Sequence, residues 1–332
     1  KKSIQNLMSQ KYLWPTNSVM PFQFEGLPIR GRICRLGPAL NKIIRQHDYS
    51  IGISKLLGEA LTLTILMADS IKLKHKLSIQ IHGKGDLKLI ATDYCISPDR
   101  SDPPRIRGYA KFNPSMDDNL ESVQDMMGEG YFATILDQGY GSVPYKGISN
   151  LDKKGLAHSA QEFFLNSEQL ETRFWVNIYE GLDHEGNTFL NGLGLMLQIL
   201  PNIEEMHTNA GVGKPGLDLN EETTTNKILS QSNWGKIVYL LNEAGSEVMS
   251  YQTDYFSDLL LKVFLDEDLR IFEEKEFDFG CGCSSDKVVQ TMSIYSKKEL
   301  HTMTNKLGKV TADCQFCGAH YEFNPSELGH NR

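Results

Sequence analysis

The most constraining feature of the sequence is a group of four cysteines near the C-terminus. One residue separates Cys281 from Cys283, two separate Cys314 from Cys317, and thirty residues lie between the two pairs. This spacing is typical of a tetrahedral site in which four thiolates bind one zinc ion. The other two of the six cysteines lie far upstream. Their separation from the group favours a metal site near the C-terminus over a chance arrangement.

The predicted zinc site is closed. Four thiolates fill the coordination shell and leave no position for an activated water, which argues against a hydrolytic metal centre. A zinc deaminase would need a proline directly before its C-x-x-C motif, whereas Asp313 stands before Cys314. Gly318 follows the second pair and suits a tight turn that points backbone amides at a thiolate. Since no nucleophile, base and orienting residue form a recognisable signature, we do not expect an enzyme.

Two interpretations of a closed site stay open from the spacing alone. In the first, a zinc ribbon only folds a short C-terminal segment. In the second, the site is a redox switch, because zinc keeps the thiols deprotonated and their oxidation to disulfides would release the metal. Zinc binding at such sites contributes roughly 10–16 kcal/mol of apparent free energy. Most small domains are less stable than that, so oxidation would unfold the segment.

Length and charge limit the remaining classes. The chain of 332 residues is long enough for two or three folding units. Its 34 basic and 42 acidic residues give a net charge of −8, which favours neither nucleic acid nor an anionic membrane as a partner. The longest apolar runs, at 60–68 and 193–200, are too short for a membrane span. We expect no signal peptide, and the cysteine usage predicts a reducing compartment, the cytoplasm.

Residues 1–200 are predicted to form one domain of mixed strands and helices. Residues 54–69 have apolar side chains at three- and four-residue spacing and are predicted to form a buried central helix. Two further helices are expected at 38–47 and 152–165. Alternating patterns and turn residues predict strands at 22–36, 77–82, 87–94, 105–112, 131–136, 144–149 and 173–179. In the first of these, Gly26 and Gly31 are expected to be bends. A meandering sheet covered by one or two helices follows from this order.

Three features of this domain could suggest catalysis, and each has a simpler explanation. Neighbours in the His47-Asp48-Tyr49 motif do not face each other at a helix end, so a capping or packing role is expected. Gly83 and Gly85 fit neither a phosphate loop nor a dinucleotide fingerprint and are interpreted as turn residues. The upstream cysteines, Cys34 and Cys95, are predicted to be small core residues.

The composition changes at residue 201. Residues 209–216 are rich in glycine and proline and predict a flexible linker. Apolar stripes at 228–241 and 259–265 predict two amphipathic helices. Either both helices simply pack on the first domain, or they are exposed conditionally. The second alternative arises because the acidic run at 273–278 leads directly from the helices into the cysteine motifs.

The sequence resembles the heat-shock protein 33 family, the redox-regulated holdase chaperones. The resemblance runs nearly end to end, and the cysteine motifs are its most specific part. The other matching segments are Phe24-Glu25-Gly26 with 29–32, His47-Asp48-Tyr49, 79–85, 108–110, 128–131, 145–147, 167–173, 194–198 and 321–323.

This resemblance implies an ATP-independent chaperone that is inactive while Cys281, Cys283, Cys314 and Cys317 hold one zinc ion. Peroxide or hypochlorous acid, together with unfolding conditions, would convert these thiolates to two disulfides, Cys281–Cys283 and Cys314–Cys317. The C-terminal segment and linker would then unfold and expose a surface for unfolding client proteins. The active oxidised form would be a homodimer that associates through the N-terminal domain.

The predicted fold class is α+β with three parts. Residues 1–200 would be a mixed sheet-and-helix chaperone core that also mediates dimerisation, and residues 201–270 a flexible helical linker. Residues 271–332 would form a small redox-sensing zinc domain.

The competing hypothesis is a regulatory protein that binds nucleic acid or a partner through an inert zinc ribbon. Residues 271–332 carry seven basic and nine acidic groups. A zinc ion with four thiolates adds about two more negative charges. A phosphate-binding ribbon is expected to show a basic surface instead, so the charge favours the chaperone hypothesis.

Overall fold

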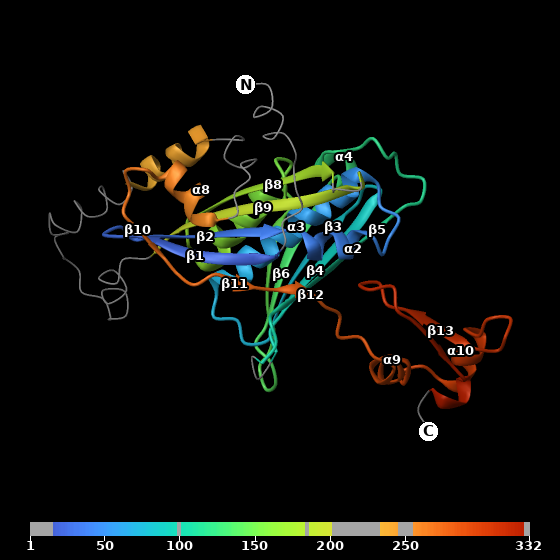
Figure 1. Ribbon diagram of the computed structural model, residues 1–332. Coiled ribbons are helices and arrows are strands. Elements are labelled where there is room, and N and C mark those ends of the chain that lie inside the picture. Colours follow the sequence, from blue (N-terminus) through green and yellow to red (C-terminus); the bar gives the residue numbers. More distant parts are fainter. Residues whose placement is uncertain (1–15, 98–100, 183–185, 201–232, 245–254, 329–332) are drawn as a thin grey trace, which may run out of the picture.

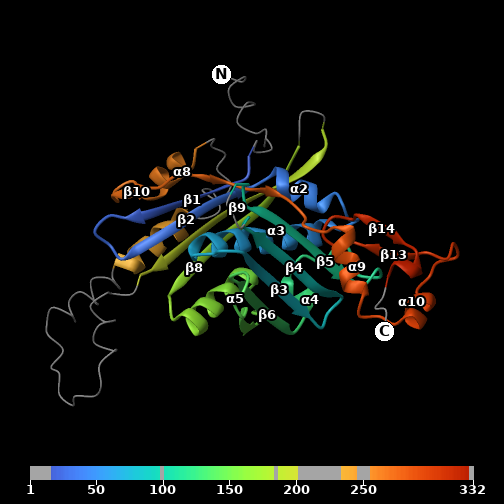
Figure 2. The ribbon, with the colours of Figure 1, turned by 90° about the horizontal axis from the view of Figure 1, so that it is seen from below.

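The fold is built around one long helix that lies between two β-sheets (Figure 1, Figure 2). The computed structural model describes residues 16–97, 101–182, 186–200, 233–244 and 255–328. The central helix, α3 (Ile51–Ser70), contributes side chains to a core that also includes the inner faces of both sheets. This mixture of sheets and helices confirms the predicted α+β class.

Helix α3 is buried on nearly all sides. It begins at Ser50, whose hydroxyl accepts a hydrogen bond from the Ile53 amide at 3.4 Å, as expected of an N-cap. The prediction of a buried central helix at 54–69 is therefore confirmed. By length and composition alone, α3 could cross a membrane. The sequence analysis did not expect this, because it considered only the shorter apolar run at 60–68 of this helix. However, 83% of the most apolar 18-residue stretch of α3 is buried inside the fold, so burial in a protein core explains its composition.

The first sheet is antiparallel and has both faces covered. Its strand order is β10 (Leu269–Ile271), β1 (Ser18–Phe24), β2 (Ile29–Leu36), β9 (Thr188–Ile199) and β8 (Thr172–Leu182), and β11 (Lys275–Glu276) also pairs with β1. The prediction of a single strand at 22–36 is wrong, because the bend expected at Gly26 is a turn, with φ +73°, that divides it into β1 and β2. Gly31, the other expected bend, lies within β2. Strand β9 was not predicted. Because both its faces are buried, its sequence shows no alternation of apolar and polar residues.

The second sheet covers the other side of α3. Its strand order is β12 (Asp278–Phe279), β5 (Arg105–Phe112), β4 (Leu87–Cys95), β3 (Lys76–Gly83), β6 (Gly130–Asp137) and β7 (Tyr145–Asn150). All neighbours are antiparallel except β12 and β5, which are parallel. The five strands predicted between 77 and 149 are confirmed within two residues at each end.

Short helices close the ends of the domain. They are α2 (Pro38–Ile44), α4 (Val123–Met127) and α5 (Leu156–Phe163), which continues into a π-helical turn, η2 (Phe164–Glu168). The helix predicted at 152–165 starts later than expected, because Gly155 adopts φ +125° and residues before it form a turn. The carboxylate of Glu59 on α3 accepts a hydrogen bond from the Ala157 amide at 3.1 Å, at the start of α5.

Two helices pack on the outer face of the first sheet and are called the cover here. They span residues 233–244 and α8 (Phe256–Val263). Their apolar side chains form a second core with β1, β2 and β9, in which Phe264, directly after α8, lies edge-on to Phe24 with ring centres 5.0 Å apart. Both predicted apolar stripes therefore pack on the first domain where they are described. The predicted linker at 209–216 and the start of the first stripe lie outside the described residues.

Residues 269–279, called the strap here, connect the cover to the cysteine motifs and cross both sheets. Strands β10 and β11 pair with β1, and β12 pairs with β5 (Figure 1). Phe277 anchors the middle of the strap, since its side chain is 2% exposed and packs edge-on against Tyr94. Salt bridges from Arg35 to Glu274 and from Lys275 to Asp69 hold the strap to the first sheet and α3.

Residues 281–328 form a small C-terminal lobe beside the second sheet (Figure 2). The lobe contains α9 (Ser285–Met292), α10 (Lys297–Thr302), the hairpin of β13 (Val310–Asp313) and β14 (His320–Phe323), and a short 3-10 helix, η3 (Pro325–Glu327). Four buried hydrophobic side chains form its core: Leu300, Val310, Phe323 and Leu328. A core of this size is small for a unit that must fold without other support.

Candidate metal centre

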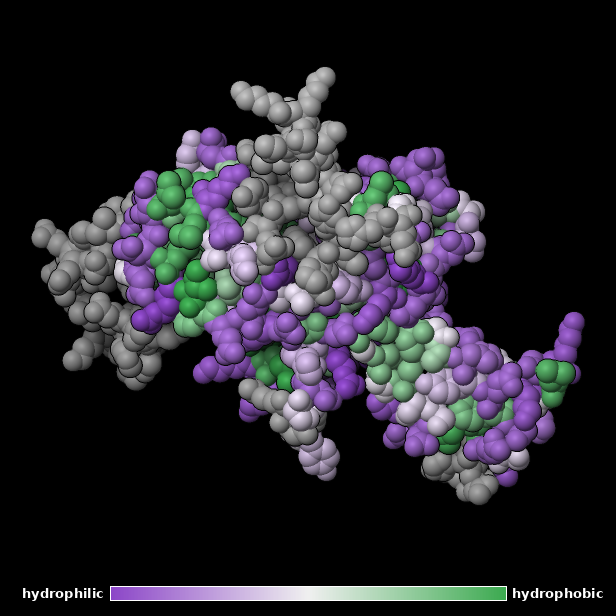
Figure 3. Space-filling view, viewed as in Figure 1, coloured by the Kyte–Doolittle hydropathy of each residue, from purple (hydrophilic) through white to green (hydrophobic). Residues whose placement is uncertain are grey.

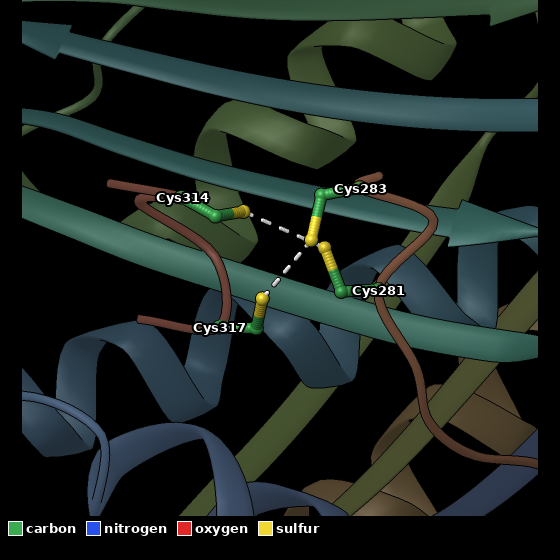
Figure 4. Close-up of side chains that lie close together, drawn as sticks. All are labelled: Cys281, Cys283, Cys314 and Cys317. Carbon is green, nitrogen blue, oxygen red and sulfur yellow. Dashed lines mark hydrogen bonds between the residues drawn. The ribbon is translucent and has the colours of Figure 1, made fainter. Parts of the chain in front are cut away.

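The four predicted ligands converge at the point where the strap enters the C-terminal lobe. Cys281 and Cys283 lie in the loop between β12 and α9, and Cys314 and Cys317 lie in the turn between β13 and β14 (Figure 4). All four sulfurs lie within 4.8 Å of one another. Two short contacts join the two motifs, with Cys281 Sγ 3.6 Å from Cys314 Sγ and Cys283 Sγ 3.3 Å from Cys317 Sγ.

These distances fit a tetrahedral zinc site. Four sulfurs at a zinc–sulfur distance of about 2.3 Å lie about 3.8 Å apart. All six cysteines are free thiols, so no disulfide competes for the group. Within the part of the chain that the structure describes, this is the only cluster of at least three cysteine, histidine or acidic residues that meets the geometry of a metal site.

The backbone around the second pair is shaped for thiolates. Gly318 has φ +64°, and its amide donates to the Cys314 carbonyl at 2.8 Å. This tight turn was predicted from the glycine. The amides of Phe316 and Cys317 approach the Cys314 sulfur, and the Ala319 amide approaches the Cys317 sulfur. Backbone dipoles therefore favour negative charge on both sulfurs.

The thiols do not ionise equally by themselves. Burial raises the pKa of Cys283, but the Tyr321 hydroxyl, 3.1 Å from its sulfur, and the neighbouring thiols outweigh burial and lower the pKa to about 7. Burial raises the pKa of Cys317 to about 12 against the Ala319 amide. Four sulfurs at this spacing would repel one another as thiolates, so the donor set fits a bound cation that compensates the negative charge.

One cationic side chain from the second sheet reaches the site. Arg107 on β5 donates from Nη1 to the Cys281 sulfur at 3.4 Å, and its Nε donates to Asp93 Oδ2 at 2.8 Å. The sequence analysis did not single out either residue. Arg105, Arg107 and Tyr109 alternate along a strand, which predicts a shared face, but no sequence signal identifies Cys281 as the partner of that face.

The other features that the sequence analysis considered have structural roles. His47 stacks on Tyr49 with ring centres 4.8 Å apart, and the Tyr49 hydroxyl accepts from the Ala110 amide at 2.8 Å, which confirms the packing interpretation. Burial lowers the pKa of His47, against the nearby Gln315 backbone in the C-terminal lobe. Cys34 is fully buried as predicted, whereas the prediction is wrong for Cys95, which is only partly buried at the end of β4.

Gly83 and Gly85 are turn residues whose backbone packs tightly. A Cβ on Gly85 would lie 2.5 Å from the Met126 carbonyl oxygen, and one on Gly83 would lie 2.6 Å from the Met127 carbonyl oxygen. These glycines therefore permit the hairpin between β3 and β4 to approach α4. This close backbone approach agrees with the interpretation as turn residues.

Comparison with known proteins places nearly the whole chain, including the cysteine group, in one family. The family model described as Hsp33 protein matches residues 17–324, which include both sheets, the cover, the strap and all four cysteines. The chain belongs to the Hsp33 family. Its similarity to named Hsp33 relatives extends over the same length. A "33 kDa chaperonin" of Caulobacter vibrioides (strain NA1000 / CB15N) is 29% identical over 316 residues, covering 92% of this chain and 94% of the relative.

Further relatives carry the same name. A "33 kDa chaperonin" of Vibrio parahaemolyticus is 27% identical over 314 residues, covering 94% of both chains. Among solved structures, the crystal structure of the 33 kDa chaperonin (Heat shock protein 33 homolog) from Thermotoga maritima superposes with a TM-score of 0.70. At 20% identity, it covers 94% of this chain and 96% of its own, and it supports the Hsp33 fold described above.

Proposed function

We propose that this Hsp33 protein is a redox-regulated, ATP-independent holdase chaperone rather than an enzyme. The observation that carries the proposal is the physical connection between four converging thiols and a helical cover over an apolar sheet. The strap is continuous with both and pairs with both sheets along the way. A chemical change at the sulfurs can therefore be transmitted to the cover through one segment of chain.

In the reduced state, we propose that Cys281, Cys283, Cys314 and Cys317 hold one zinc ion. The bound ion would supply charge compensation and a closed tetrahedral coordination, which stabilise the C-terminal lobe. The Tyr321 hydroxyl would donate to the Cys283 sulfur and Arg107 to the Cys281 sulfur, which favours the thiolate form of both. These contacts support the assignment because they match hydrogen-bond donors to sulfurs that carry negative charge.

Activation is proposed to be oxidation of the four thiols to two disulfides, Cys281–Cys283 and Cys314–Cys317. Each disulfide consumes one molecule of a peroxide, which accepts two electrons and, with two protons, leaves as two molecules of water or its alcohol equivalent. Sulfur distances do not select the pairing, because the contacts between motifs are also short. Loop closure favours partners close in sequence over partners more than thirty residues apart.

Loss of the four ligands would leave the C-terminal lobe with a core too small to stay folded. The strap makes only short strand pairings and partly exposed salt bridges outside the Phe277 anchor, so we propose that it separates next. The cover would follow. Its departure would expose the apolar outer face of the first sheet, formed by side chains such as Phe22, Ile33 and Leu195.

That uncovered face is the proposed binding surface for unfolding client proteins. Exposed apolar patches of this extent are typical of surfaces that bind proteins. Some apolar side chains are already accessible on α8, directly after it and on the strap: Leu261, Leu265, Ile271 and Phe272. Figure 3 shows hydrophobic surface over the region of α8 and β10. These side chains could make the first contact with a client before the cover separates.

Family membership supports the remaining parts of the proposal. The active oxidised form would be a homodimer, and the protein would act in the cytoplasm. Residues 1–200 would be the chaperone core and dimerisation domain, 201–270 the linker, and 271–332 the redox-sensing domain.

An aggregation assay tests the proposal directly. The reduced, zinc-loaded protein is expected not to suppress light scattering by a thermally unfolding client, whereas peroxide-treated protein at elevated temperature is expected to suppress it. Cys281→Ser should weaken zinc retention and activate the protein without oxidant. Cys95→Ser is the matched control, because this thiol lies outside the four-sulfur group, and it should behave as wild type. Equal suppression by reduced and oxidised wild type would contradict the switch.

A further inference from the structure

The second sheet presents a polar and aromatic surface to the C-terminal lobe. On β5, Arg107 and Tyr109 lie on the face opposite the core, since the alternating residue Ile106 is fully buried inward. The Arg107 side chain is 19% exposed, although it carries a full charge. A charged side chain this well covered needs partners on all sides.

Arg107 has partners on both the sheet and the lobe. Its Nε and Nη2 donate to Asp93 Oδ2 at 2.8 and 2.5 Å, and Asp93 Oδ1 accepts from the Ser78 hydroxyl at 2.5 Å. On the lobe side, Nη1 donates to the Cys281 sulfur at 3.4 Å, and the guanidinium carbon lies 4.1 Å from the centre of the Phe316 ring. One side chain therefore contacts Cys281 of the first motif and Phe316 of the second.

Other contacts hold the lobe at the same place. The Gly280 amide donates to the Ile106 carbonyl at 3.2 Å, directly after the two-residue pairing of β12 with β5. Tyr109 packs edge-on against Phe316 with ring centres 4.9 Å apart. These are a backbone hydrogen bond and a ring contact between neutral groups. Their strength does not depend on the charge of the sulfurs, in contrast to the contact from Arg107 to Cys281.

We infer that Arg107 is a positioning residue that couples the chemical state of Cys281 to the docking of the C-terminal lobe on β5. A guanidinium N–H binds a thiolate as a charge-assisted hydrogen bond. The sulfur of a disulfide is neutral and a weak acceptor, so oxidation removes this contact while Arg107 keeps its pair with Asp93. The inference deepens the proposed function and rests on it, because it names a contact through which oxidation loosens the lobe.

The surroundings of Arg107 would allow an oxidant to reach Cys281 while the C-terminal lobe is still docked on β5. A cavity of about 410 Å³ adjoins it and is lined by the strand ends and by residues that flank Cys281, including Cys95, Arg105, Gly280, Gly282 and Lys287. A small oxidant can therefore approach the first cysteine motif while the lobe is still docked. The first bond lost on oxidation would be the one from Arg107.

Hydrogen exchange at Gly280 and the β12 amides measures docking separately from chaperone activity. In wild type, these amides should be protected in the zinc-loaded reduced protein and lose protection after peroxide treatment. In Arg107→Gln, protection in the reduced state should fall about ten-fold, because a charge-assisted bond is lost. After oxidation, which removes this contact from wild type as well, the variant and wild type should show the same protection. Zinc release to a chelator should accelerate by a similar factor.

Two more variants separate coupling from packing. Arg107→Lys keeps a cation beside Asp93 and so protects the fold, but it cannot donate to Asp93 and Cys281 together, and it should lie between wild type and Arg107→Gln. Lys76→Gln is the matched control, since it removes a charge from the same cavity without a sulfur contact, and it should match wild type.

Equal protection in Arg107→Gln and wild type overturns the inference. So does a variant whose protection falls by the same factor in the reduced and oxidised states, which would make Arg107 a packing residue only. If wild-type protection does not respond to zinc removal or oxidation at all, the proposed switch itself fails. The behaviour of wild type therefore distinguishes failure of the proposed function from failure of the coupling.

Discussion

Helix α3 and the C-terminal lobe obtain their stability in opposite ways. Of the twenty residues of α3, sixteen are buried between two sheets, whereas no residue of α9 in the lobe is buried. Apolar burial stabilises α3 independently of the redox environment. The lobe has a small core and four converging sulfurs, so we expect its fold to depend on their chemistry. A chain with both kinds of region can lose one and keep the other.

Zinc removal should give the largest effect that tests this comparison. Structural zinc contributes about 10–16 kcal/mol of apparent free energy. A chelator is therefore expected to unfold the lobe and leave α3 folded, because the four cysteines are not part of the core around α3. Hydrogen exchange would show loss of protection in α10 and β13 with unchanged protection in α3. Simultaneous loss in both regions would mean that they form one cooperative unit.

A single substitution directly after α8, where the cover meets the first sheet, should have the next largest effect. Phe264 is fully buried between Phe22 and Phe24, and Phe264→Ala should destabilise the cover by about 3–5 kcal/mol. The variant should suppress client aggregation without oxidant while it still binds zinc. Leu57→Ala in α3 is the matched control, because it loses core stability of similar size without uncovering the sheet. Zinc-loaded Phe264→Ala that stays inactive would contradict the role of the cover.

The two regions should also respond to pH in opposite directions. Burial raises the pKa of Glu59 on α3 to about 7, against hydrogen bonds from the backbone at the start of α5. The folded state then binds more protons than the unfolded state, so core stability should fall as pH rises from about 4.5 to about 7, by at most about 3 kcal/mol. Zinc binding improves over this range, because thiols must lose protons to bind it.

Glu59→Gln isolates this effect. The amide oxygen of glutamine can still accept from Ala157, but it does not titrate in this range. Denaturant unfolding of the variant's core should show a flatter pH profile than wild type between these values. If both proteins show the same slope, another group causes it.

Much of the fold was predictable because the sequence pattern is local. Strand β5 was predicted with its observed bounds, and the glycine turn between β3 and β4 was identified. Strand β9 escaped because its burial on both faces depends on the cover, which is distant in sequence. The bend at Gly26 was predicted, but not that it divides two strands, because the pattern on either side of it is similar.

In the candidate site, the four cysteines were also predictable from the local sequence, whereas Arg107 was not. Spacing alone identified the four cysteines, since the geometry of a metal site restricts how far apart its ligands lie in the chain. Arg107 could not be predicted, because it lies 174 positions from Cys281 in the chain and the pairing of β12 with β5 brings the two together. The spacing of candidate ligands can be read from the sequence, whereas the residues that position them can be identified only from the tertiary structure.

The strap is held to the two sheets by three short strands. Its three pairings, at β12, β11 and β10, lie one after another along the chain and are only two, two and three residues long. In the proposed switch, these pairings would open one after another, from the sulfur end toward the cover, and each step would break only a few hydrogen bonds. The pairings would re-form in the opposite order, beginning with β10 on β1 beside the cover. A client bound to the uncovered face would block this first step, so the protein would stay open after the oxidant is gone.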